Sequence, residues 1–355
     1  IYSILDPTGQ TTARQLTPSS DRTPFIISEI MYHPADSAGT NSLEYIEIFN
    51  TDPVARDISG FRISGDVDYT FPPGTTMGFR SYVVVARDPA AIQQAYGINA
   101  VFGPFTGNLP NNAGTVRLRN DYGGIVLEVD YEDQHPWPIA ADGAGHSLQL
   151  NKPDYGEGFA RAWEASAFVN GSPGGMDKST ESPLRGIVIN EFLAHTDLPA
   201  IDYVELYNRG TQSVDISGCG LSDAPETNKF VVPPATILPP GSHIVFDQSM
   251  LGFSLQSAGD EIYLSAPDSS FVVDAVRFDA QPNGVSSGRY PDGASMFHAL
   301  DAQTPGVANM TAALLIDDVV INEVMYAPLS SKEQDEYVEL YNKGTNDVDL
   351  GHWRF

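Results

Sequence analysis

Pairs of glutamates recur at matching positions along the 355-residue chain. The pairs are Glu29 with Glu47, Glu191 with Glu205, and Glu323 with Glu339. Two carboxylates that face each other on neighbouring strands repel unless a cation or a proton lies between them. Because Ca²⁺ takes six to eight oxygen ligands, clustered carboxylates suit a calcium site. One interpretation of these six glutamates is therefore a repeated calcium site that stiffens the fold.

A second interpretation needs no metal. The glutamates would then form a solvated acidic face or bond to the adjacent chain, and no loop has the spaced aspartates of an EF-hand. Side chains alternate across a strand, so Tyr203-Val-Glu-Leu-Tyr-Asn208 should place Val204 and Leu206 on one face. We expect Glu205 on the other face, pointing outward with a tyrosine on each side.

Signals for catalysis are weak. Gly284-Val-Ser-Ser-Gly288 has the spacing of a nucleophile elbow, but it follows Gln-Pro-Asn in a turn-like stretch and opens no helical segment. The seven histidines are scattered without the spacing of a zinc site, and no phosphate-cradling loop occurs. We expect no enzyme, no catalytic residue and no cofactor other than calcium.

Trp137 is a candidate ligand contact. It lies in His135-Pro-Trp-Pro138, a proline-rich turn. A tryptophan in a rigid loop can stack on a sugar ring or anchor a protein partner. Alternatively, such a tryptophan folds back to cover the end of a sandwich.

Three copies of one ordered set of motifs must position these residues. Each copy has an Ile-(Ser/Asn)-Glu run, then an acidic-Tyr-(Ile/Val)-Glu run that ends in Asn, then an Asp-(Ile/Leu) element. In chain order they begin at Ile27, Glu44 and Asp57, at Ile189, Asp202 and Asp215, and at Ile321, Glu336 and Asp349. The first two copies also close with similar turns, Gly171-Ser-Pro-Gly-Gly175 and Gln303-Thr-Pro-Gly-Val-Ala-Asn309.

Short apolar runs fill the first two copies. Runs rich in Val, Ile, Tyr and Phe, bounded by Gly, Asn, Asp and Pro, predict an antiparallel sandwich or barrel. They cover residues 82–86, 115–118, 125–131, 243–246, 261–264 and 271–278. We expect only one helix, over residues 90–96, with Asp88 as its cap, Pro89 at its first position and Gly97 as its end. The second copy should lack it.

The repeated motifs resemble the opening strands of the lamin tail domain, an immunoglobulin-like sandwich found in nuclear lamins and in many secreted bacterial proteins. The late stretch Asp142-Gly-Ala-Gly-His-Ser-Leu-Gln-Leu150 is similar to the bacterial members. The resemblance implies an all-β fold of tandem immunoglobulin-like antiparallel β-sandwiches. It says little about activity, because one fold hosts many functions.

The same resemblance divides the chain. Residues 25–175 and 185–309 should form two sandwiches, and residues 319–355 should be the incomplete start of a third repeat. Residues 1–24 would be a linker or the tail of a preceding segment, and residues 176–184 and 310–318 would be linkers. The third repeat is too short to bury its own apolar face, so we expect this chain to be part of a longer array.

The amino-acid composition excludes several classes of function. With 46 acidic and 19 basic residues, the net charge of −27 makes binding to nucleic acid very unfavourable and repels anionic membranes. No apolar run approaches the roughly 18 residues of a membrane span. Cys219 is the single cysteine, so no intrachain disulfide or cysteine-based metal site can form. Few thiols and strong acidity favour an exported, extracellular or surface-displayed bacterial protein.

We therefore expect a non-catalytic structural, adhesive or spacer protein that contacts protein, matrix or polysaccharide partners, with self-assembly as a further option. One alternative is a carbohydrate-binding array, in one form calcium-dependent. Another is a set of accessory domains for an enzyme whose catalytic domain lies outside this chain.

Overall fold

The computed structural model describes most of the chain. The described residues are 2–5, 11–14, 23–35, 42–177, 182–225, 227–310, 318–326, 328, 330, 332–345, 347–348 and 350. Much of the expected tail (residues 1–24) and of the two expected linkers (176–184 and 310–318) lies outside these ranges. Strands β1 (Tyr2–Leu5) and β2 (Thr11–Arg14) pair antiparallel within the first of those segments.

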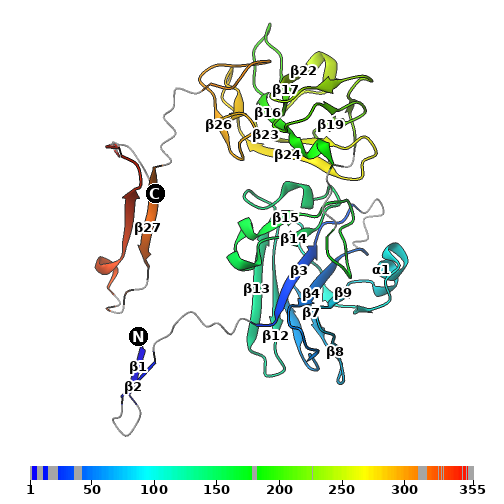
Figure 1. Ribbon diagram of the computed structural model, residues 1–355, viewed down its shortest axis with the longest axis vertical. Coiled ribbons are helices and arrows are strands. Elements are labelled where there is room, and N and C mark those ends of the chain that lie inside the picture. The colour runs from blue at the N-terminus through cyan, green and yellow to red at the C-terminus, as the bar shows by residue number, and fades with distance from the viewer. Residues whose placement is uncertain are drawn as a thin grey trace.

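Two sheets face each other in the first sandwich (β3 to β15; Figure 1). One sheet has the order β10 (Val101–Phe102), β9 (Tyr82–Ala86), β4 (Tyr45–Asn50), β3 (Phe25–Met31), β14 (Leu148–Leu150) and β15 (Trp163–Ala165). The other has the order β11 (Thr106–Gly107), β7 (Val67–Thr70), β6 (Arg62–Gly65), β12 (Ala113–Arg119) and β13 (Ile125–Glu132). A short pair, β5 (Arg56–Asp57) and β8 (Thr76–Met77), lies at one end. Among the described strands of this sandwich, β9 and β10 are the one parallel pair.

The second sandwich (β16 to β26) repeats the plan with fewer strands. One sheet has the order β22 (His243–Asp247), β17 (Tyr203–Asn208), β16 (Ile187–Leu193), β25 (Ser287–Arg289) and β26 (Phe297–Ala299). The other has the order β20 (Phe230–Val231), β19 (Gly220–Ser222), β23 (Gly259–Ser265) and β24 (Val272–Asp279). A short pair, β18 (Val214–Asp215) and β21 (Ile237–Leu238), completes it. The expected all-β sandwich architecture is confirmed.

Alternating apolar side chains from the two sheets build each core. In the first sandwich Ile46 and Ile48 of β4 lie in one buried cluster with Val116 and Leu118 of β12. In the second, Val204 and Leu206 of β17 lie in one cluster with residues of β19, β23 and β24. The expected core face of β17 is therefore confirmed.

Helices are few and short. The helix α1 (Pro89–Tyr96) has the predicted cap: the Asp88 carboxylate accepts hydrogen bonds from two amides of the first turn, and Gly97 ends the helix at φ 69°. A counterpart was not expected in the second copy, and that prediction was wrong. A single turn, α2 (Gln248–Leu251), follows β22 with Asp247 and Gly252 as its caps. Four residues are too few for a helical period to be visible in the sequence.

The described residues also contain the 3₁₀ turns η1 (Ile139–Ala141), η2 (Pro153–Tyr155), η3 (Ala160–Ala162), η4 (Pro183–Gly186) and η5 (Glu333–Asp335). Within the described part of the chain, no helix has the length and apolar character to cross a membrane.

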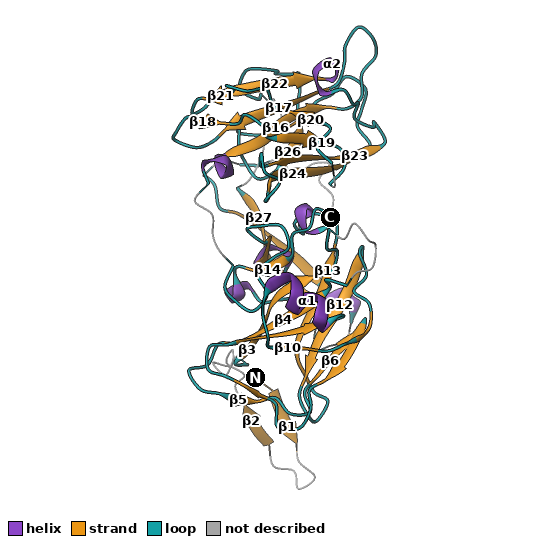
Figure 2. Ribbon diagram, turned by 90° about the vertical axis from the view of Figure 1, so that its right-hand side faces the viewer, coloured by secondary structure: helices purple, strands orange, loops and turns teal. Residues whose placement is uncertain are grey.

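The third repeat is a hairpin of β27 (Val319–Met325) and β28 (Tyr337–Asn342). It stands apart from both sandwiches in Figure 1. Figure 2 shows the two sandwiches stacked along the long axis of the molecule. The third motif of this repeat, which begins at Asp349, lies mostly outside the described residues.

Candidate functional site

One bulged hairpin opens each of the three repeats. The antiparallel register shifts by one residue between Ile27 and Glu29, between Ile189 and Glu191, and between Ile321 and Glu323. A bulge places two residues of one strand opposite one of its partner. The shift brings the paired glutamates directly opposite each other, as Glu29 with Glu47, Glu191 with Glu205 and Glu323 with Glu339.

Glu29 lies at the centre of a donor-lined site. Its side chain is 0% exposed. Its Oε1 accepts hydrogen bonds from the Tyr45 hydroxyl at 2.6 Å, the Ser147 hydroxyl at 2.5 Å and the Ser172 amide at 2.9 Å. Opposite it, Glu47 accepts from the Ser28 hydroxyl at 2.6 Å. A carboxylate with several donors is stable without a metal.

Glu47 also receives a backbone donor. The Gly174 amide donates to its Oε2 at 2.6 Å. Gly174 and Ser172 both belong to the closing turn Gly171-Ser-Pro-Gly-Gly175. This turn therefore covers the glutamate pair and donates one amide to each carboxylate. The sequence separation is 143 residues for the bond from Ser172 to Glu29 and 127 for the bond from Gly174 to Glu47.

The second sandwich reproduces the arrangement around Glu191. That carboxylate accepts from the Tyr203 hydroxyl at 2.5 Å, the Thr304 amide at 3.0 Å and the Thr304 hydroxyl at 2.8 Å. Thr304 belongs to the second closing turn. A tyrosine from the second strand and an amide from the closing turn thus occupy the same places as in the first sandwich.

Glu205 is equally enclosed, at 0% exposed. It accepts from the Asn190 side-chain amide at 3.0 Å and from the Gly306 amide at 2.6 Å. Our expectation that Glu205 points outward into solvent was wrong. Its face of the sheet is covered because the turn that contains Gly306 folds back over β16 and β17, about a hundred residues after them in the chain.

Glycines make the closing turn of the first sandwich possible. Gly171 has φ +70°, in the left-handed region that side chains disfavour. A Cβ at this position would lie 2.2 Å from Glu29 Oε1 and 2.3 Å from the Tyr45 hydroxyl oxygen. Gly306 of the second sandwich also has a positive φ, of +83°.

Burial changes the protonation of these carboxyls. Desolvation raises the pKa of Glu29 to about 7 and that of Glu205 to about 7, although their hydrogen-bond donors act in the opposite direction. Desolvation and the charge of Glu29 raise the pKa of Glu47 to about 8. The phenol of Tyr45 also has a pKa raised by burial, so it stays a donor. The first pair therefore takes up a proton near neutral pH.

Other positions that recur between the copies also bind neighbouring loops and turns. Glu44 and Asp202, which begin the second motif, accept the amides of Leu109 and Leu255. The asparagines that end this motif cap the next turn, since the Asn50, Asn208 and Asn342 side chains accept the amides of Asp52, Gly210 and Gly344. The motif as a whole ties loops to strands.

The surroundings of the paired glutamates can be compared with those that a calcium site needs. Among the described residues, no group of three or more His, Cys, Asp or Glu side chains could hold a metal ion. Within the two sandwiches each of the four paired glutamates accepts hydrogen bonds from hydroxyl, side-chain amide or backbone N–H donors, although Glu29 Oε2 has no hydrogen-bond partner within the part of the chain that the structure describes. This geometry favours the alternative in which the glutamates bond to the adjacent chain, and calcium binding stays a prediction.

In the third hairpin Glu323 and Glu339 keep part of this arrangement. The Tyr337 hydroxyl donates to Glu323 at 2.7 Å, and the Asn322 side chain donates to Glu339. Both glutamates are exposed.

Trp137 lies in the core of the first sandwich. It is 6% exposed and packs on Trp163, with ring centroids 6.1 Å apart. The neighbouring His135 and Pro136 of the proline-rich turn are exposed, whereas the tryptophan itself is buried. Of the two interpretations of this tryptophan, the structure favours the one in which it covers the end of a sandwich.

An interface between the two sandwiches was missed by the sequence analysis. Ala140 and Ala144 of the first sandwich pack with Tyr263 and Val272 of the second. Phe168 and Phe271 meet edge to face, with ring centroids 6.3 Å apart. The two sandwiches therefore share an apolar interface.

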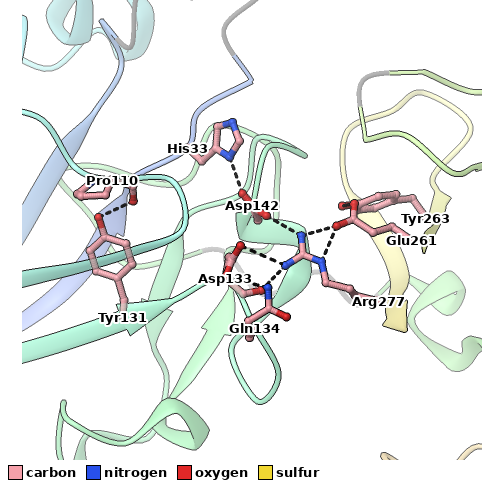
Figure 3. Close-up of polar contacts among 9 residues, drawn as sticks. All are labelled: His33, Pro110, Tyr131, Asp133, Gln134, Asp142, Glu261, Tyr263 and Arg277. Carbon is pink, nitrogen blue, oxygen red and sulfur yellow. Dashed lines mark hydrogen bonds and ion pairs between the residues drawn. The ribbon is translucent and has the colours of Figure 1, made fainter. Parts of the chain in front are cut away.

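Arg277 of β24 is the polar centre of that interface (Figure 3). It donates to the Asp142 carboxylate at 2.6 Å and to the backbone oxygen of Asp133, both in the first sandwich, and it pairs with Glu261 on the neighbouring strand β23. His33 contacts the same Asp142 carboxylate. Hydrogen bonds from His33 and Arg277 lower the pKa of Asp142 despite its partial burial.

His146 bridges the sandwiches by backbone contacts. Its Nε2 accepts the Val272 amide at 2.9 Å, and its Nδ1 contacts the Ser166 carbonyl at 2.7 Å. Burial lowers the pKa of this imidazole to about 4, and the charge of Arg185 acts in the same direction. His146 is therefore neutral at neutral pH, the state in which it can accept the Val272 N–H.

The missed residues had only weak signals in the sequence. The recurrence of Ser/Thr-Pro-Gly at the end of two copies marked the closing turns, but nothing in a local pattern connects these turns to glutamates more than a hundred residues earlier. Arg277 and Asp142 occur in different repeats and have no shared spacing.

The folds, the bulged hairpins and the closing turns together define a tandem array of immunoglobulin-like β-sandwiches. The sequence profile of the Lamin Tail Domain family matches residues 18–133, 180–279 and 315–355, which is more than half of the chain. The chain therefore belongs to the Lamin Tail Domain family, and the resemblance seen in its repeated motifs is confirmed. A comparison with curated proteins gives no match.

Solved structures with some likeness are carbohydrate-active enzymes. They include the exo-chitosanase CsxA of Amycolatopsis orientalis and the exo-β-D-glucosaminidase CsxA inhibited by a castanospermine analogue, each with 14% sequence identity and a TM-score of 0.17. The match covers 72% of this chain and 26% of those enzymes, so the chain spans about a quarter of their length. At this level of likeness the matches support no inference about activity.

Proposed function

We propose that this chain is a non-catalytic spacer of an exported bacterial surface protein, which holds a partner-contacting surface in a fixed position. The observation that carries the proposal is the interface around Arg277, which joins two sandwiches into one body. Family membership supports it at a coarser level, since the family consists of immunoglobulin-like modules. The polar residues that define the repeats are also engaged in holding strands and turns together.

Stiffness is what the interface contributes. Domains within one chain move relative to each other by default unless their interface is apolar or otherwise firmly held. Here the apolar contact of Phe168 with Phe271 lies beside an arginine that is paired with carboxylates of both sandwiches. Removing the arginine from a partly buried charge cluster destabilises the interface more than removing an exposed ion pair would. The carboxylates that remain then repel each other.

Small-angle scattering tests the proposal. We expect the wild-type chain to give a narrow range of maximum dimensions, and Arg277→Met to broaden it, because Asp142, Asp133 and Glu261 are left without their shared cation. Arg62→Met is the matched control, since Arg62 pairs with Asp68 on the surface of the first sandwich. A wild-type chain whose sandwiches tumble independently in NMR relaxation would contradict the proposal.

A cleft on the first sandwich supports a second candidate function, carbohydrate binding. A cavity of about 640 Å³ is lined by Phe49, Tyr82, Gln149 and Glu164, among other residues. The Phe49 and Tyr82 rings lie 4.5 Å apart, and Glu164 accepts a hydrogen bond from the Asn151 side chain. Aromatic rings beside amides and a carboxylate suit a sugar chain.

Affinity electrophoresis in gels that contain soluble polysaccharides tests this candidate. Retardation of the wild-type chain that is lost in Tyr82→Ala but kept in Tyr122→Ala, an exposed tyrosine away from the cleft, would support it. Repeating the gels with calcium and with chelator tests the calcium-dependent form, and no retardation on any polymer would remove the candidate.

A further inference from the structure

An aromatic pair lies at the same place in both sandwiches, on the sheet that contains the glutamates. Phe49 of β4 lies opposite Tyr82 of β9 in the first sandwich, and Tyr207 of β17 lies opposite His243 of β22 in the second. The ring centroids of these pairs are 4.5 Å and 4.7 Å apart. The surroundings of the two pairs can therefore be compared position by position.

In the second sandwich a turn of the same chain covers the aromatic pair. Residues 290–294 form this turn, in which the Ala294 amide donates to the Pro291 carbonyl at 3.0 Å. Gly293 lies against the Tyr207 ring, since a Cβ at this glycine would be 3.2 Å from Tyr207 Cε1. The turn thus fills the space above the ring.

The carboxylate of Asp292 anchors this covering turn. It accepts the Asn190 side-chain amide at 3.1 Å and the Asn309 backbone amide at 2.9 Å, and it lies 3.1 Å from His243 Nε2. The Gly293 amide donates to Asn190 Oδ1 at 3.0 Å. One aspartate and the amide after it therefore fix the turn to the sheet.

In the first sandwich the corresponding connection is longer. Residues 151–162 join β14 to β15, whereas residues 290–296 join β25 to β26. The Asn151 and Lys152 amides both donate to the Ala162 carbonyl, at 2.9 Å and 3.0 Å. These bonds hold the start of the connection beside its end, next to β15.

The counterpart of the covering turn lies at the rim of the cleft in the first sandwich. Pro153 and Asp154 correspond to Pro291 and Asp292, and both are exposed. Pro153 lines the cleft together with the aromatic pair. The first sandwich thus has an open cleft at the place where the second sandwich holds a turn.

The three positions that anchor the covering turn also line this cleft. The first is the bulged residue of the opening strand, and the second is the aromatic position on the third strand of the sheet. The third follows the closing turn's donor glycine by three residues. In the first sandwich these positions hold Ser28, Tyr82 and Asp177, in place of Asn190, His243 and Asn309.

The groups at these positions keep the hydrogen-bonding capacity that the turn needs. The Ser28 hydroxyl donates to Glu47 at 2.6 Å, and its oxygen can still accept an N–H. Burial raises the pKa of Tyr82, so its hydroxyl stays protonated and can donate. Asp177 contributes a backbone amide, as Asn309 does in the second sandwich.

The charges that line the cleft allow a carboxylate to enter. Desolvation and the charge of Glu29 raise the pKa of Glu47 to about 8, so Glu47 is mostly protonated at neutral pH. Lys152 pairs with Glu164 at 3.5 Å. The guanidinium of Arg185 interacts electrostatically with Asp177. Each of these carboxyls therefore carries a proton or has a cation beside it.

We propose that the cleft of the first sandwich binds a turn of a partner polypeptide that contains the sequence Pro-Asp-Gly. The aspartate of the partner accepts from the Tyr82 hydroxyl and the Asp177 amide, and the glycine amide donates to Ser28 Oγ. A second copy of this chain does not offer its Pro-Asp-Gly turn, residues 291–293, because that turn is bound within its own sandwich. The cleft is then the partner-contacting surface of the proposed spacer; this role rests on the spacer proposal, whereas the binding itself does not.

A cyclised, fluorescently labelled peptide with the sequence of residues 289–295 tests the cleft. In fluorescence anisotropy with the full chain at pH 7, we expect saturable binding. A peptide with alanine in place of its aspartate should bind at least about ten-fold more weakly, because charge-assisted hydrogen bonds are among the stronger ones.

Variants of the chain locate the binding. Tyr82→Phe removes one hydroxyl and should weaken the peptide by about five-fold, the effect of one lost hydrogen bond. Tyr122→Phe is the matched control, since Tyr122 is 91% exposed and does not line the cleft, and it should leave the affinity unchanged. Circular dichroism checks that both variants stay folded.

Exchange of the peptide into the second sandwich is tested with His243→Phe. This variant removes a contact of the chain's own turn with Asp292 and should leave binding to the first sandwich as it is. Binding that is lost in His243→Phe but kept in Tyr82→Phe would overturn the proposal.

Three other results would also overturn it: an absence of saturable binding, equal binding of the alanine peptide, and full affinity in Tyr82→Phe. Polysaccharide retardation that is lost in Tyr82→Ala, without any peptide binding, would assign the cleft to a sugar chain instead. The spacer proposal fails separately, since a chain that binds the peptide while its two sandwiches tumble independently would keep the cleft and lose only the spacer role.

Discussion

At the scale of single residues, the recurring glutamates serve as acceptors inside the fold. Glu29 accepts hydrogen bonds from Tyr45 of β4, from Ser147 just before β14 and from Ser172 of the closing turn. Burial of a carboxyl changes its pKa, so its protonation is coupled to folding. Two consequences follow for experiments, one concerning pH and one concerning the glycine beside Glu29.

Stability should fall as pH rises from about 5 to about 8. The ordinary pKa of a glutamate is 4.5, and burial raises the pKa of Glu29 to about 7 and that of Glu47 to about 8. In that window the folded state binds more protons than the unfolded state, so the stabilisation is fully present below pH 4.5 and is lost as pH passes through the folded pKa values. We expect this loss of stability to appear as a melting temperature that falls as the pH rises from about 5 to about 8.

Glu47→Gln should flatten this pH dependence, because it removes one of the titrating groups. Glu132→Gln is the control, since Glu132 is exposed at the end of β13 and should leave the slope as it is. A melting temperature that rises steadily from pH 5 to pH 8 in the wild-type chain would contradict the prediction.

Gly171→Ala should destabilise the first sandwich by about 2–4 kcal/mol. The residue has φ +70°, and a Cβ would overlap Glu29 Oε1 and the Tyr45 hydroxyl, so the closing turn would have to move off the glutamate pair. Gly158→Ala is the matched control, because its position has open space around it and no positive φ. Urea denaturation that shows equal midpoints for both variants would disprove this account.

At the scale of elements, local signals in the sequence explain what could be predicted. The Asp88-Pro89 start and the Gly97 end located α1, and alternation located the core face of β17, because both depend on neighbouring residues. The exposure of Glu205 and the role of the closing turns could not be predicted, since they depend on contacts across more than a hundred residues. The candidate calcium residues were correctly paired by register, although their donors were not foreseen.

The cap of α1 provides a test at this scale. Asp88→Ala should cost about 1 kcal/mol, because the amides of Ala90 and Ala91 lose their acceptor at 3.0 Å and 3.1 Å. Asp88→Ser keeps an acceptor and should restore most of the stability. Hydrogen exchange of the α1 amides should speed up in the alanine variant only, and equal exchange in both variants would argue against a capping role.

At the scale of the whole molecule, the two sandwiches form one body through groups that respond to acid. The neutral His146 accepts the Val272 amide, and burial lowers its pKa to about 4. A protonated imidazole cannot accept that hydrogen bond. Apolar contacts such as Phe168 with Phe271 do not titrate, so they hold part of the interface at any pH.

Lowering the pH should therefore weaken the interface between the two sandwiches. Because the folded pKa of His146 is lower than its ordinary value of 6.5, the unfolded or separated state binds more protons between pH 6.5 and 4, and the interface weakens as pH falls through that window. We expect small-angle scattering to show a wider range of dimensions at pH 4 than at pH 7.

His146→Gln keeps a neutral acceptor and should reduce this response to acid. His195→Gln is the control, because His195 contacts the Gln281 carbonyl within the second sandwich, away from the interface. If both variants open in acid to the same extent as the wild-type chain, the response belongs to another group.

The closing turn also sets an order of events during synthesis. Ser172 leaves the ribosome 143 residues after Glu29. At typical elongation rates of 5–20 residues per second, that interval is on the order of 10 s. During this time the opening hairpin has its two carboxylates but lacks the turn that covers them, so it stays hydrated and open to other strands. Each sandwich is thus completed by one of its last-made segments, and a nascent chain that carries several repeats always exposes one unfinished hairpin at a time.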